Sequence, residues 1–120
     1  MDLTLTSEPW PKDASVIVLT VNGDLDVYTT PQFREVLLSL HEDGCRRLVI
    51  SGDGCWYLDS TGLGAMLAAL KRARKAGGGV AIACTRPDVI KVLQITALIK
   101  VFIVADTVDE AARSLLDGDR

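Results

Sequence analysis

The sequence is poor in the side chains on which metal sites and most nucleophilic active sites depend. It has one histidine and three cysteines among 120 residues. Cys45, Cys55 and Cys84 are widely spaced, form no C-x-x-C pair, and His41 stands alone. This scarcity argues against a zinc ribbon or a thioredoxin-type centre, and we expect no metal site, no cofactor and no catalytic residue. We expect the cysteines to serve as small apolar groups, with Cys55 partly exposed.

The chain also lacks a basic excess and a long apolar run. Its formal net charge is −3 and its pI is about 5.0, whereas a nucleic-acid-binding domain is usually basic. No apolar stretch approaches the roughly 18 residues of a membrane span, and residues 1–4 do not resemble a signal peptide. We therefore expect a cytoplasmic protein that binds neither nucleic acid nor a membrane.

What the sequence does contain is a regular strand–helix alternation, in a chain with the length of one domain (residues 1–120). Apolar spacing predicts strands at 3–6, 16–21, 47–51, 80–83 and 100–105, and helices at 30–43, 63–76, 86–95 and 109–116. This order indicates an α/β fold with a single, mostly parallel mixed β-sheet of about five strands and about four α-helices. The N-terminal strand is expected to be an antiparallel edge.

Local signals predict several boundaries. Residues 7–13 hold two prolines and are expected to form a loop. Thr30 followed by Pro31 is typical of a helix start, with the Thr30 hydroxyl as the cap. The helix at 86–95 is expected to turn Ile95 inward.

The stretch with the most chemical content is Asp59-Ser60-Thr61-Gly62-Leu63-Gly64, at a predicted strand-to-helix turn. A helix N-terminus presents free N–H groups and a positive dipole end, which favour anions. The stretch does not fit a Rossmann loop, because Leu67 replaces the third glycine, and it lacks the Gly-Lys-Ser/Thr of a P-loop. It does not fit a serine-hydrolase elbow, because Leu58 replaces the first glycine and no base accompanies Ser60.

Two interpretations of this turn remain open. In the first, Asp59, Ser60 or Thr61 caps the helix by accepting hydrogen bonds from its first-turn N–H groups. In the second, the two glycines, which weaken a first helical turn, let another surface approach the helix start closely.

The same stretch resembles the phosphorylation-site motif of bacterial anti-sigma factor antagonists, which are small STAS-domain proteins. Residues 23–26 (Gly-Asp-Leu-Asp) are similar to the family's segment before the first helix, and residues 91–102 resemble its late helix-to-strand passage. The STAS fold also has the predicted element order. One departure is Ala97, where the family commonly has glycine. If that position needs a positive φ, alanine costs about 1 kcal/mol or more.

The resemblance implies a partner-switching cycle that regulates transcription, as in a bacterial stress response. The unmodified protein would bind an anti-sigma factor that is also a serine kinase of the GHKL type, and the sigma factor would be released. That kinase would phosphorylate Ser60, and a PP2C-type phosphatase would remove the phosphate. The protein would then be a regulator and a kinase substrate, not an enzyme.

The expected partner-binding residues lie in two segments. They are Asp59, Ser60, Thr61, Gly62, Leu63 and Gly64 in the motif, and Asp26, Tyr28 and Thr29 before the first helix. A phosphate adds about −1.5 to −2 charges, which a helix N-terminus tolerates. The switch is therefore expected to act on the partner contact and not by unfolding the domain.

Other functions stay open from the sequence. The main alternative is a STAS scaffold or binding subunit of a larger sensory or transport assembly that is not switched at Ser60. A Ser60-dependent hydrolase and a thiol sensor at Cys55 or Cys45 have less support, because no base and no pairing motif accompanies them. The protein is expected to be a monomer or a weak dimer.

Overall fold

The sheet starts from an antiparallel pair of strands that is longer than the sequence predicts. In the computed structural model, which describes residues 3–117, β1 (Thr4–Trp10) pairs with β2 (Asp13–Leu25). The predicted loop at 7–13 is wrong over residues 7–10, which continue β1, and at residue 13, which begins β2. Pro9 is tolerated there because β1 is an edge strand. No further strand lies on its outer side, so the N–H that proline lacks is not needed there for strand pairing.

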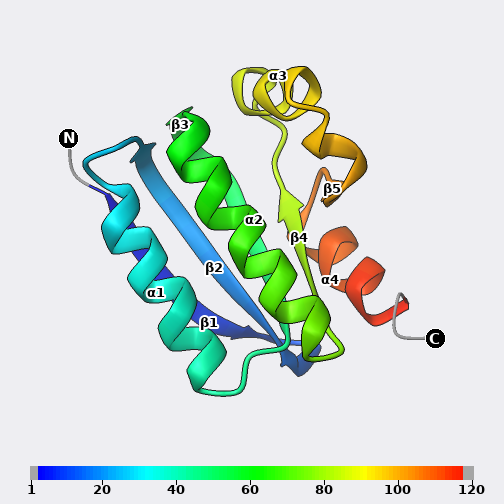
Figure 1. Cartoon of the computed structure of the whole chain (residues 1–120). Coiled ribbons are helices and arrows are strands. Elements are labelled where there is room, and N and C mark those ends of the chain that lie inside the picture. Colours follow the sequence, from blue (N-terminus) through cyan, green and yellow to red (C-terminus); the bar gives the residue numbers. More distant parts are fainter. Residues whose placement is uncertain (1–2, 118–120) are drawn as a thin grey trace.

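The remaining strands run parallel to β2 and complete the order β1-β2-β3-β4-β5 (Figure 1). β3 (Arg47–Leu58) and β4 (Gly79–Ala83) contain the expected apolar runs, and β3 continues well beyond its prediction. β5 (Ile103–Ala105) is shorter than expected, because the chain before it forms a 3-10 turn, η1 (Leu98–Lys100). The predicted mixed α/β sheet with an antiparallel N-terminal edge is confirmed.

Helices cover both faces of the sheet. α1 (Thr30–Glu42) and α2 (Ser60–Lys75) lie on one face, and α4 (Val108–Asp117) lies on the other, whereas α3 (Pro87–Ile95) sits near the end of β3 (Figure 1). The larger core fills the space under α1 and α2, and a smaller one lies under α4. In the smaller core, Trp10 donates Nε1–H to Asp109 Oδ1 at 2.8 Å and so ties β1 to α4.

Two helix details differ from the sequence-based predictions. Thr30 is the first residue of α1 and not its cap; Thr29 holds the cap position and makes no side-chain cap hydrogen bond. Ile95 is 74% exposed, because the short α3 buries only Val89 and Leu93 on its inner face.

β2 and β3 extend beyond β4 and carry both candidate segments to the same end of the sheet. The register between them shifts twice within residues 20–24, so this extension is bulged. Gly54 fits here because a Cβ at this position would lie 2.8 Å from the backbone oxygen of Val21. The two strands end at Leu25 and Leu58, directly before the loop and the turn that form the site.

Ala97 joins α3 to η1 and has the left-handed backbone conformation, which is the case in which we expect alanine to carry a cost. Its φ is 61°, and within residues 3–117 no other non-glycine residue has a positive φ. For an L-residue with a Cβ this conformation costs about 1–2 kcal/mol. The positive φ at Ala97 is therefore confirmed, and the chain leaves α3 through a turn that glycine would make more easily.

Candidate functional site

Asp59 is the N-cap of α2, and its carboxylate is committed to the helix. Its extended backbone (φ −113°, ψ −174°) lets Oδ1 accept from Thr61 N at 2.9 Å and from Gly62 N at 3.2 Å. The Thr61 hydroxyl donates to the same oxygen. Asp59 N donates to Leu25 O at 3.1 Å, which fastens the turn to the end of β2. Of the three residues that the sequence offered as caps, Asp59 is the one that caps.

Ser60 follows directly and lies in a different environment. It is the first residue of α2, and it is exposed. Among residues 3–117 its hydroxyl has no hydrogen-bond partner, whereas the hydroxyl oxygens of Thr61 and Thr30 are 3.3 Å apart and link α2 to α1. The turn therefore combines a fixed carboxylate with a solvent-facing hydroxyl one residue later.

The two glycines of the motif have different surroundings. Gly62 is buried, and a Cβ there would lie 2.8 Å from Leu58 Cδ1 and 3.0 Å from Leu25 Cβ. Gly62 thus allows a close approach within the protein itself, between α2 and the ends of β2 and β3. Gly64 is exposed, and the nearest atom to a Cβ there would be Arg34 Nη2, at 3.5 Å. Gly64 is the glycine that leaves room for an outside surface.

The second candidate segment is a hydrogen-bonded turn before α1. Asp26 Oδ1 accepts from Thr29 N at 3.0 Å and from Tyr28 N at 2.9 Å. These hydrogen bonds, with that of Thr29 the strongest influence, hold the pKa of Asp26 below its ordinary value. Thr29 Oγ1 donates to Asp24 O at 2.6 Å and fastens the turn to β2. The Tyr28 side chain projects from this rigid turn and is 87% exposed.

The structure brings both segments to one end of the sheet and sorts their residues by exposure. Exposed are Tyr28, Ser60 and Gly64; partly buried are Asp26, Asp59 and Thr61; buried are Thr29, Gly62 and Leu63. The first group can touch another molecule directly. The last group supports the site from within.

Exposed aromatic residues lie at the same end, and the sequence-based reasoning missed them. Trp56 is 64% and Tyr57 is 53% exposed, near the end of β3. Tyr57 pairs with Asp24 of β2, close to the turn that carries Tyr28. The Arg86 guanidinium stacks on Trp56, 4.1 Å from the ring centroid. Two aromatic residues within three positions of a predicted surface turn are the signal that could have revealed this patch.

The cysteines do not contribute to the site. Cys55 is 2% exposed, so the prediction of partial exposure is wrong; its side chain faces the larger core. Burial raises the pKa of the Cys55 thiol, and it does the same for Cys45 and Cys84, which disfavours reactive thiolates. Residues 3–117 contain no cluster of three or more His, Cys, Asp or Glu side chains able to hold a metal ion. The same part of the chain has no helix with the length and apolarity to cross a membrane.

Comparisons with known proteins identify the family of this chain. Residues 10–111 match the STAS domain family. The chain belongs to this family. This STAS protein is 33% identical over 98 residues to the anti-sigma-B factor antagonist of Bacillus subtilis (strain 168), with 82% of this chain and 84% of the relative covered. It is 45% identical over 51 residues to the anti-sigma-B factor antagonist of Staphylococcus aureus (strain NCTC 8325 / PS 47), which is 42% of this chain and about half (47%) of that relative.

Solved structures show the same fold. An anti-sigma factor antagonist from Mycobacterium paratuberculosis superimposes with a TM-score of 0.83 at 23% identity, covering 97% of this chain and 96% of that one. The phosphorylated form of the Bacillus cell fate determinant SpoIIAA gives a TM-score of 0.66 at 21% identity, covering 99% of this chain and 100% of that one. At these identities the likeness establishes the fold alone.

Proposed function

We propose that this STAS protein is an anti-sigma factor antagonist that is switched by phosphorylation of Ser60. The unmodified protein binds an anti-sigma factor, and the sigma factor is released. The observation that carries the proposal is the exposed Ser60 hydroxyl directly after the capping Asp59. Similarity to an anti-sigma-B factor antagonist over 82% of this chain supports the same role.

The partner contacts the end of the sheet where β2 and β3 finish. Ser60 and Gly64 on α2 and Tyr28 before α1 offer direct contacts, and Asp26, Asp59 and Thr61 line the surface between them. Thr29, Gly62 and Leu63 contribute by holding these groups in place. The exposed rings of Trp56 and Tyr57 add apolar area of the kind that anchors protein interfaces.

Phosphorylation acts on this contact because the Asp59 carboxylate already occupies part of the N-terminus of α2. The N–H groups of Thr61 and Gly62 already donate to Asp59 Oδ1, so they are not available to a phosphate on Ser60. The phosphate therefore adds charge and bulk at the surface beside a carboxylate, and it repels or displaces the partner. A loss of about 3–4 kcal/mol at such a contact weakens binding about 10²- to 10³-fold.

The anti-sigma factor itself supplies the modification as a serine kinase of the GHKL type. Ser60 Oγ bonds to the γ-phosphorus of ATP, the bond to ADP breaks, and the hydroxyl proton is released. A PP2C-type phosphatase hydrolyses the phosphoserine and restores the binding form. The protein is the substrate in both reactions.

The proposal is tested by incubating the protein with its cognate anti-sigma factor and ATP, followed by peptide mass spectrometry. We expect one phosphate on Ser60 and none in Ser60→Ala. Thr61→Ser is a matched control that keeps a hydroxyl next to the site and should leave the modification at Ser60. Phosphate on residue 61 alone, or no phosphate with a stable large complex on gel filtration, would contradict the proposal; the second result would favour a scaffold subunit.

A further inference from the structure

Arg34, on α1, reaches over the exposed face of α2 at Gly64. A Cβ on Gly64 would lie 3.5 Å from Arg34 Nη2, so the guanidinium lies close to where a side chain at position 64 would begin. Side chains on a helix lean toward its N-terminus and cover the preceding turn. That preceding turn begins at Ser60, four residues earlier on the same face.

Ser60 comes within reach of this cation once it carries a phosphate. Cβ atoms four residues apart on a helix are separated by about 5–6 Å, so Arg34 Nη2 lies no more than about 9.5 Å from Ser60 Cβ. A phosphoryl oxygen extends three bonds beyond that Cβ, and a charge-assisted N–H···O hydrogen bond spans about 2.7–2.9 Å. Rotation of the exposed Arg34 side chain closes the remaining distance.

No acidic side chain lies one helical turn from Arg34 or from Gly64. The positions one turn away are Thr30, Pro31, Leu37 and Leu38 on α1, and Ser60, Thr61, Leu67 and Ala68 around Gly64 on α2. None of them is acidic. Within residues 3–117 the Arg34 guanidinium takes part in no ion pair or side-chain hydrogen bond, and Asp59 Oδ1 is already committed to the start of α2.

We propose that Arg34 holds the phosphate of phosphorylated Ser60 across the contact between α1 and α2. This inference rests on the proposed function, in which Ser60 is the modified residue. A guanidinium binds phosphate through two parallel N–H···O hydrogen bonds, which fix its position. The phosphate then lies over the open surface at Gly64, so modification both adds charge and closes the space that the unmodified protein leaves for its partner.

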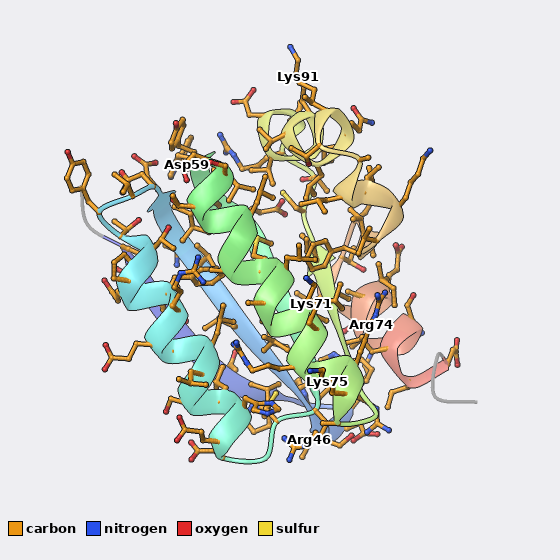
Figure 2. All side chains as sticks on the ribbon, viewed as in Figure 1. Arg46, Asp59, Lys71, Arg74, Lys75 and Lys91 are labelled. Carbon is orange, nitrogen blue, oxygen red and sulfur yellow. The ribbon has the colours of Figure 1, made fainter. Side chains whose placement is uncertain are left out.

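The test uses phosphoserine installed at position 60 during translation and a ³¹P NMR titration of its phosphate. A neighbouring cation favours the dianion and lowers the second phosphate pKa, which is ordinarily about 6. We expect this pKa to be at least about 0.5 lower in the parent phosphoprotein than in Arg34→Gln, with Arg34→Lys in between. Lys75→Gln removes the same charge about 22 Å away at the other end of α2, opposite Asp59 in Figure 2, and should leave the pKa unchanged.

Equal phosphate pKa values in the parent protein and Arg34→Gln would overturn the pairing. An equal rise in Lys75→Gln would also overturn it, because the effect would then belong to the net charge. The measurement needs neither a kinase nor an anti-sigma factor. The pairing can therefore fail while Ser60 phosphorylation still controls partner binding, and the proposed function can fail while the pKa difference persists.

Discussion

Alanine in place of Gly62 should lower the stability of the fold, whereas alanine in place of Gly64 should raise it. At Gly62, a Cβ would lie 2.8 Å from Leu58 Cδ1 and 3.0 Å from Leu25 Cβ, so α2 must shift away from the ends of β2 and β3. Overpacking of this kind costs about 1–3 kcal/mol, which outweighs the gain of about 0.5–1 kcal/mol from alanine's helix propensity. At Gly64 the nearest contact is an ordinary 3.5 Å to the mobile end of Arg34, so the propensity gain remains.

Urea unfolding followed by circular dichroism measures both variants. We expect Gly62→Ala to lower the free energy of unfolding by about 1–2 kcal/mol and Gly64→Ala to raise it by about 0.5–1 kcal/mol. The slope m should match the parent in both, because neither change alters the surface exposed on unfolding. Equal effects of the two substitutions would refute the separation of an inward Gly62 from an outward Gly64.

Three further predictions concern other parts of the molecule. Ala97→Gly should raise the free energy of unfolding by about 0.5–1 kcal/mol, because it relieves the strain at φ 61°, whereas Ala76→Gly, at φ −91°, should lower it; thermal melts of both compare them directly. Because the pKa of Asp26 is lowered in the folded protein, the ionised carboxylate stabilises the fold at pH values above its unfolded pKa, which is near 4. This stabilisation is lost as the pH falls through the lower pKa of the folded state. The stability difference between the parent and Asp26→Asn should therefore shrink between pH 5 and pH 2 in acid titrations (ordinary Asp pKa about 3.9); a difference independent of pH would contradict the hydrogen bonds assigned to this carboxylate. Ser60→Asp should fold with an unchanged spectrum and a stability within about 0.5 kcal/mol of the parent, because the residue is exposed, and an unfolded variant would argue against a switch confined to the surface.

The order of elements could be predicted because apolar spacing follows secondary structure closely in this chain. Thr30-Pro31 marked the start of α1 to within one residue, and the position of α2 followed from its motif and the glycines after it. Pro9 misled the prediction. A proline breaks a strand only where the backbone N–H that it lacks is needed for pairing. Whether a strand lies at the edge is decided by the assembled sheet, which the local sequence does not show. The shortened β5 followed from the backbone turn at Ala97, which apolar content alone does not reveal.

The candidate site was visible in the sequence only as a local motif. Its chemistry depends on neighbours that lie far away along the chain. Gly62 is packed against Leu25, which precedes it by 37 positions, and Arg34 reaches Gly64 from another helix. Cys55 was misplaced for the same reason, because the bulges between β2 and β3 decide which residues face the core.

Control of partner binding by Ser60 can be measured by titrating the cognate anti-sigma factor with the protein carrying serine or phosphoserine at position 60, using isothermal titration calorimetry. We expect that the serine form binds and that the phosphoserine form binds about 10²- to 10³-fold more weakly, while both forms unfold at similar urea concentrations. Equal affinities of the two folded forms would contradict it.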